Sequence, residues 1–119
     1  MKRLILLLAA LALAAVAADI AGTWKATAEG PNGTIERIFV FKVDGGKLTG
    51  ETTSPIMGKS AILDGKVEGD NLSFSIVVNF QGNEMKVNYK GKVTGEEMRL
   101  TATIADGDFT LEWRARKVS

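Results

Sequence analysis

The 119-residue sequence contains no cysteine, no histidine and only two prolines. Without cysteine the chain forms no disulfide, so a packed core must hold the fold together. Without histidine it lacks the usual metal ligand, the usual haem ligand and the commonest general base. These absences lead us to expect a protein that is not an enzyme, with no catalytic residue, no metal site and no cofactor.

Residues 1–18 have the pattern of a secretory signal peptide. Two basic residues at the start precede an apolar run from Leu4 to Leu13, and small residues continue to Ala18. The apolar run is too short for a convincing membrane anchor. We therefore expect cleavage after Ala18, or after Ala17, and an exported protein that is periplasmic or extracellular and soluble.

The remaining residues, 19–119, form a nearly neutral segment. The whole chain has 15 basic and 14 acidic side chains, and removal of Lys2 and Arg3 with the leader leaves 13 basic ones and a formal net charge of −1. Such a balance provides no general basic surface for nucleic acid, which we therefore do not expect as a partner. A length of about a hundred residues suits one small domain.

After Asp19 the hydrophobic pattern alternates with period two, which is typical of β-strands. Turn signals such as Asp44-Gly45-Gly46 separate the strands, and most connections are short enough for hairpins. Closure of the last strand on the first would remove both exposed edges. The sequence therefore predicts an all-β fold, an eight-stranded antiparallel up-and-down β-barrel in meander order, with a two-sheet sandwich as the alternative. The predicted strands are 20–29, 34–44, 47–54, 60–69, 72–80, 84–94, 98–105 and 108–117.

The charged face of the strand 84–94 argues against a barrel that spans a membrane. Met85, Val87 and Tyr89 alternate there with Lys86 and Lys90. Outer-membrane barrels carry apolar residues outside and polar residues inside, so the lysines would lie against lipid at a cost of roughly 2–4 kcal/mol each near the midplane. We expect the apolar faces to line the interior and the charged faces to meet water.

Two aliphatic residues of the strand 34–44 do not follow this pattern. If Phe39 and Phe41 face inward, Ile38 and Val40 face outward. They represent either ordinary surface exposure or a contact with a second copy of the chain or with a host domain.

The stretch Gly22-Thr23-Trp24 resembles the calycin group, which comprises lipocalins, fatty-acid-binding proteins and avidins. In that group a Gly-x-Trp opens the first strand, the Trp plugs the closed end, and a basic residue near the C-terminus packs across it. The resemblance implies that Gly22 and Trp24 form the plug with Arg114 or Arg116, and a cation–π contact gives this pairing a physical basis.

The chain is also similar to small secreted bacterial domains of largely uncharacterised function that begin with a Gly-Thr-Trp-Lys stretch. It departs from the named calycins in several respects. It lacks the disulfides common in lipocalins, the helical lid of the fatty-acid carriers and the biotin-contacting residues of avidins. The resemblance therefore implies a fold and does not imply one of their ligands.

In a meander barrel the longest connection, 55–59, lies at the end opposite Trp24, and this end should be open. Inward Arg37 is the most informative residue there, because a buried charge requires a carboxylate partner, water or an anionic ligand. Glu29, Glu51 and Glu84 lie near the same end and are candidate partners. The residues predicted to line a ligand site are Arg37, Thr52, Ser54, Leu63, Phe80, Met85 and Tyr89.

Two functions follow from this arrangement. The first is a non-enzymatic barrel that binds a small apolar or weakly anionic ligand at its open end. The alternative is a structural module that contacts a protein or the cell envelope and has a filled barrel without a ligand. The sequence does not decide between a filled and a hollow interior, since large inward residues such as Phe39 and Trp113 oppose small ones such as Ala26 and Ala102.

Overall fold

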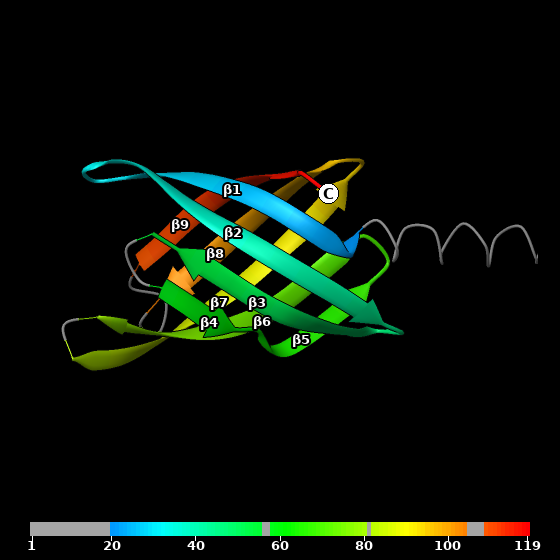
Figure 1. The fold of residues 1–119 in the computed structure, drawn as a ribbon, viewed down its shortest axis with the longest axis horizontal. Helices are drawn as coiled ribbons and strands as arrows, with labels where there is room; N and C mark the ends of the chain where they lie inside the picture. Colours follow the sequence, from blue (N-terminus) through cyan, green and yellow to red (C-terminus); the bar gives the residue numbers. More distant parts are fainter. Residues whose placement is uncertain (1–19, 56–57, 81, 105–108) are drawn as a thin grey trace, which may run out of the picture.

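The computed structural model describes residues 20–55, 58–80, 82–104 and 109–119, without the side chain of Phe80. The predicted signal peptide therefore lies outside the described residues. The described chain forms a closed antiparallel β-barrel of steeply tilted strands (Figure 1). Its strands are β1 (Gly22–Gly30), β2 (Gly33–Asp44), β3 (Lys47–Ser54), β4 (Gly58–Ala61), β5 (Leu63–Glu68), β6 (Asn71–Phe80), β7 (Asn83–Thr94), β8 (Glu97–Ile104) and β9 (Phe109–Lys117).

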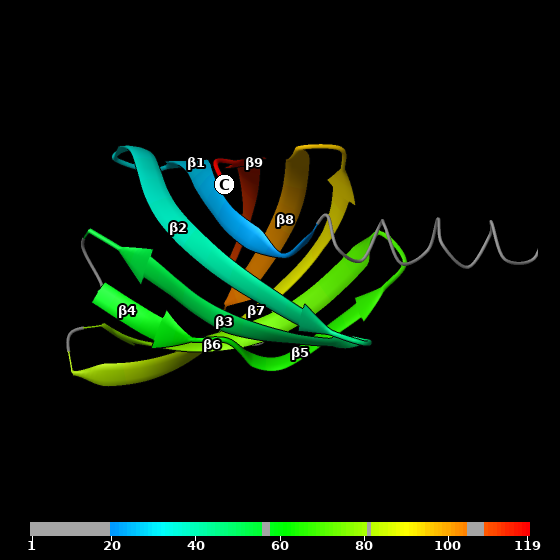
Figure 2. The same cartoon turned by 45° about the vertical axis from the view of Figure 1, so that its right-hand side comes forward.

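The order of the strands confirms the predicted meander. Consecutive strands pair antiparallel around the wall, and β9 pairs with β1 to close the barrel. Strands β4 and β5 together occupy the fourth of eight positions, since both pair with β3 and only β5 pairs with β6. The result is an all-β, eight-stranded up-and-down barrel rather than a sandwich, and its curvature is clear in Figure 2.

The predicted strand 60–69 is in fact broken into β4 and β5. Ile62 lies between them, and Asp64 has a φ of 52°, the left-handed region that L-residues with a side chain seldom adopt. An irregularity of one residue exchanges the two faces of a strand. Ile62 is accordingly buried, whereas Leu63 is 40% exposed on the outside. The prediction that Leu63 lines the ligand site is therefore wrong.

Aromatic rings fill the closed half of the barrel. The Phe74 and Tyr89 rings stack with their centroids 4.8 Å apart, and the Phe39 ring meets each of them edge-on at 5.7 Å. Phe41 stacks on Phe39 at 5.4 Å. Such pairs contribute about 0.5–1.5 kcal/mol each beyond the area that they bury. They form a solid layer beneath the open half.

Trp24 closes the narrow end, as the calycin resemblance implies. Its side chain is fully buried, and its indole Nε1 donates a hydrogen bond of 2.9 Å to the Ile20 carbonyl oxygen. Gly22 has a φ of 134°, and a Cβ there would collide with the backbone carbonyl of Ser119. The glycine thus lets the C-terminal segment cross the barrel end, where Thr23 N donates to Ser119 O at 3.0 Å.

The basic residue that packs across Trp24 is Lys117. Its Nζ lies 5.9 Å from the centroid of the Trp24 ring, and the two residues are directly paired between β9 and β1. Arg114 and Arg116 are exposed on the other face of β9, and Arg116 pairs with Glu97 at 3.2 Å. The implied roles of Arg114 and Arg116 are therefore wrong, because alternation along the strand points both away from the interior.

Ile38 and Val40 lie on the outer face of β2, as predicted. Both are half-buried, and their neighbours in register include Lys25 on β1 and Glu51 on β3. A contact with another chain through this pair stays a prediction. Among the described residues no helix is long and apolar enough to cross a membrane.

Candidate functional site

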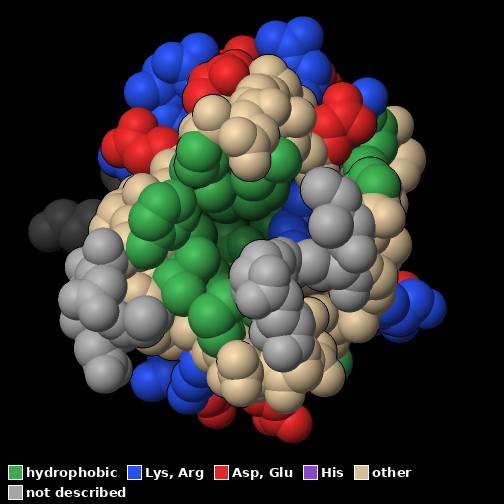
Figure 3. Space-filling view, turned by 90° about the vertical axis from the view of Figure 1, so that its left-hand side faces the viewer, with side chains coloured by type: hydrophobic (Ala, Val, Ile, Leu, Met, Phe, Trp, Pro, Cys, Tyr) green, Lys and Arg blue, Asp and Glu red, His purple; other side chains and the backbone are tan. Residues whose placement is uncertain are grey.

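The open half of the barrel contains a cavity of about 420 Å³. Seen from this end, hydrophobic side chains surround a hollow with a basic group inside it (Figure 3). Among the described lining residues the one basic side chain is Arg37. The cavity is lined by Thr34, Ile35, Glu36, Arg37, Ser54, Pro55, Ile76, Val78, Met85, Val87, Tyr89, Ala102, Ile104, Leu111 and Trp113.

Small inward side chains make this hollow possible. In the strand register Ala102 stands opposite both Tyr89 and Leu111, and Ala28 stands opposite Ile35. Ala26 likewise stands opposite Arg37 on the inner face. These alanines leave volume that larger residues would fill, whereas phenylalanine rings pack against one another in the closed half.

Arg37 reaches the cavity because it lies on the inner face of β2, together with Ile35 and Phe39. Its side chain is buried, with 6% exposure. Nη1 donates a hydrogen bond of 3.3 Å to the Thr52 hydroxyl, and that hydroxyl donates in turn to the Ile38 carbonyl oxygen at 2.8 Å. Arg37 Nε is buried and has no hydrogen-bond partner among the described residues.

None of the three glutamates considered as partners forms an ion pair with Arg37 in the described part of the chain. Glu29 accepts a hydrogen bond from Thr34, and Glu51 forms an ion pair with Lys59 at 3.5 Å. Glu84 is exposed. Among the described residues, the guanidinium is therefore a buried charge that a neutral hydroxyl holds in place without compensating it.

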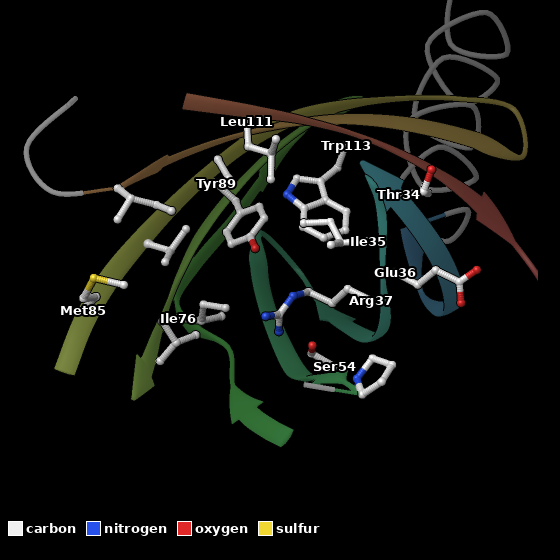
Figure 4. Close-up of a pocket in the computed structure, with 15 residues that line it drawn as sticks. Thr34, Ile35, Glu36, Arg37, Ser54, Ile76, Met85, Tyr89, Leu111 and Trp113 are labelled. Atoms are coloured by element: carbon white, nitrogen blue, oxygen red, sulfur yellow. The ribbon is translucent and has the colours of Figure 1, made fainter. Parts of the chain in front are cut away.

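Tyr89 lies on the aromatic layer at the floor of the cavity. Its hydroxyl points toward the Arg37 guanidinium in Figure 4. Burial raises the pKa of Tyr89 above the usual 10.0, and the Arg37 charge opposes part of that rise. The phenol therefore keeps its proton at neutral pH and remains a hydrogen-bond donor.

Trp113 contributes the third donor. Its side chain is 5% exposed, and its indole Nε1 is buried without a hydrogen-bond partner among the described residues. In Figure 4 this nitrogen faces the side of the cavity where the Tyr89 ring lies. Sequence reasoning placed Trp113 inward as a filling residue and did not recognise it as a lining donor.

The structure brings most of the predicted site residues together. Arg37, Ser54, Met85 and Tyr89 line the cavity, and Thr52 lies behind Arg37. Leu63 lies outside, as described above, and the side chain of Phe80 falls outside the described residues.

Val87 was also expected at an inward position near the open end, and the other lining residues were not predicted as site residues. Ile76, Val78 and Trp113 all occupy inward positions that the period-two pattern identifies, so a signal for their orientation was present. The pattern does not predict how far along the barrel side chains fill the interior, because this depends on side chains from strands that are far apart in the sequence.

Few ionisable side chains line the described cavity. Its ionisable groups are Arg37, Tyr89 and Glu36, and the Glu36 carboxylate points away from it and lies 3.8 Å from Lys25 Nζ. Among the described residues no group of three acidic side chains is placed to hold a metal ion. The described lining therefore offers hydrogen-bond donors and one positive charge in an apolar enclosure.

The fold and the cavity define this protein as a closed antiparallel β-barrel, plugged at one end and hollow at the other. Searches against protein-family models and against curated proteins give no match for this chain. The closed eight-stranded architecture is the one that a calycin barrel has. A relationship to that group beyond the architecture is part of the proposal that follows.

Proposed function

We propose that this protein is an exported, calycin-like binding protein that holds a small, largely apolar molecule in the open half of its barrel and does not transform it. The observation that carries the proposal is the 420 Å³ cavity, which lies above a solid aromatic layer. Pockets of about 300–1,000 Å³ with apolar walls and few polar groups are typical of small-molecule sites. The leader-like residues 1–18 support action after export.

The hollow also favours binding over the alternative of a filled structural barrel. Apolar side chains around a hollow make fewer packing contacts than those of a filled core. A barrel with a hollow at its open end lacks packing contacts that larger residues at positions such as Ala102 would supply. A bound ligand restores those contacts.

The experiment is binding of an uncharged apolar fluorophore, N-phenyl-1-naphthylamine, to the purified protein. Leu111 is half-buried and lines the cavity, so the larger ring of Leu111→Trp should narrow the space and weaken the fluorescence increase. The matched control is Thr110→Trp, which places the same ring on the adjacent exposed position. Equal binding by both variants, or none by the wild type, would contradict the proposal.

Native mass spectrometry gives an independent test. Protein that is produced from the full chain and purified without organic solvent should carry a small molecule as a noncovalent adduct. The Leu111→Trp variant should carry less of it than the Thr110→Trp variant.

A further inference from the structure

Three side chains with hydrogen-bond donors line the floor of the cavity, and they come from three separate strands. Arg37 lies on β2, Tyr89 on β7 and Trp113 on β9. All three side chains line the cavity and are more than nine-tenths buried. Figure 4 shows the Tyr89 hydroxyl directed toward the guanidinium and the Trp113 nitrogen on the side of its indole that faces the Tyr89 ring.

Two of these donors are unsatisfied by the described protein. Arg37 Nε and Trp113 Nε1 are buried and have no partner among the described residues. A buried donor without a partner destabilises the folded protein, and more so when the donor is charged. Two such groups beside one cavity indicate that a bound molecule supplies acceptors to them.

The described floor of the cavity also has an excess of positive charge. Arg37 is the one described basic residue that lines the cavity, and the described lining contains no carboxylate that points inward. The group that compensates it should therefore be a monoanion. A phosphate monoester carries about −1.5 to −2 charges at pH 7 and would leave an uncompensated buried charge. A carboxylate carries one, and its two oxygens suit the fork of a guanidinium.

The depth of the donors sets the orientation of the ligand. Arg37 lies one inward position deeper than Ile35 on β2, and Trp113 lies one deeper than Leu111 on β9. On β7 both Met85 and Val87 lie between Tyr89 and the open end. The polar groups are thus at the floor, and apolar side chains form the wall above them.

We propose that the ligand is an apolar monocarboxylate that enters head first, so that its carboxylate binds Arg37, Tyr89 and Trp113 and its apolar body extends toward the mouth. This inference rests on the proposed binding function. The cavity volume corresponds to about 14 water molecules at roughly 30 Å³ each, which suits a medium-length chain or a small ring system.

The test uses probes that share one tail and differ in the head group: decanoate, decan-1-ol, decyl phosphate and decyltrimethylammonium, measured by isothermal titration calorimetry at pH 7. Decanoate should bind at least about tenfold more tightly than decanol, since a hydrogen-bonded charge contributes about 1.5–3 kcal/mol. Decyl phosphate should be weaker than decanoate, and the cation weakest.

Variants identify the groups responsible. Arg37→Met should lower the ratio of decanoate to decanol affinity about tenfold or more, and Trp113→Phe should lower decanoate affinity several-fold. Lys90→Met removes a positive charge from the exposed face of β7 and should change neither affinity. Retained decanol binding by Arg37→Met shows that the variant is folded.

The orientation has its own readout. A bromine at the second carbon of decanoate should quench Trp113 fluorescence more than a bromine at the tail end, and the difference should vanish in Trp113→Phe. The reverse order would overturn the head-first orientation. Equal affinity for decanoate and decanol would overturn the carboxylate inference and leave the binding function standing. Failure of every probe, together with no binding of the uncharged fluorophore, would overturn both.

Discussion

The Thr52 hydroxyl holds Arg37 inside the barrel: it accepts a hydrogen bond from Arg37 Nη1 at 3.3 Å while it donates one to the Ile38 carbonyl oxygen at 2.8 Å. Thr52 is completely buried and lies on β3, directly opposite Phe39 of β2. One hydroxyl therefore fixes the position of the charge on which the proposed recognition depends.

Removal of that hydroxyl should destabilise the protein. Thr52→Val preserves the shape of the side chain but leaves Arg37 Nη1 without its partner, so we expect a loss of about 1–3 kcal/mol in the free energy of unfolding. Thr52→Ser retains the hydroxyl and should lose less. Urea unfolding followed by fluorescence measures both values, and equal losses would show that the hydrogen bond contributes little.

The two tryptophans should respond differently to the same substitution. Trp24→Phe removes the donor to the Ile20 carbonyl, and we expect it to lower the free energy of unfolding by about 1–3 kcal/mol. Trp113→Phe removes a donor that has no partner among the described residues, so it should cost less stability while weakening carboxylate binding. Chemical denaturation compares the two variants. A larger loss for Trp113→Phe would contradict this assignment of roles.

Gly65 should be intolerant of any side chain. A Cβ at this position would collide with the backbone carbonyl of Leu48, on the paired strand β3. We expect Gly65→Ala to cost about 3 kcal/mol or more, because backbone atoms cannot move aside as side-chain ends do. Gly46→Ala is the control, since its Cβ would lie 3.5 Å from Val67 O, an ordinary contact. Thermal unfolding should show a much larger decrease in Tm for Gly65→Ala.

Tyr89 should make stability depend on pH in the alkaline range. Its pKa is raised by burial in the folded state, so the folded protein keeps a proton that the unfolded chain loses. The stabilisation is complete below the unfolded pKa of about 10 and decreases as the pH rises through the raised value. Between pH 9 and about 11 the wild type should therefore lose more stability than Tyr89→Phe. The two proteins have the same lysines, so lysine titration affects both equally. Parallel decreases in the two proteins would show that Tyr89 titrates normally.

Period-two alternation was sufficient to orient most of the barrel. It correctly places Phe74 and Ile76 of β6 and Val87 and Tyr89 of β7 in the interior. It failed at Leu63, because the irregular backbone at Asp64 interrupts the alternation. The residue types in this segment do not predict such an irregularity. Alternation applied to β9 also puts Lys117 on the same face as Trp113, so the signal against Arg114 and Arg116 was present in the sequence.

Local features of the chain determined the architecture. Alternating strands and short turns each involve residues close in sequence, and a meander barrel is the arrangement that satisfies them all. Tertiary structure decided that the closed half is filled and the open half is hollow, and that Arg37 faces Thr52 and no glutamate. These outcomes depend on the volumes and registers of side chains from β2, β3, β7 and β9, which only closure of the barrel brings together.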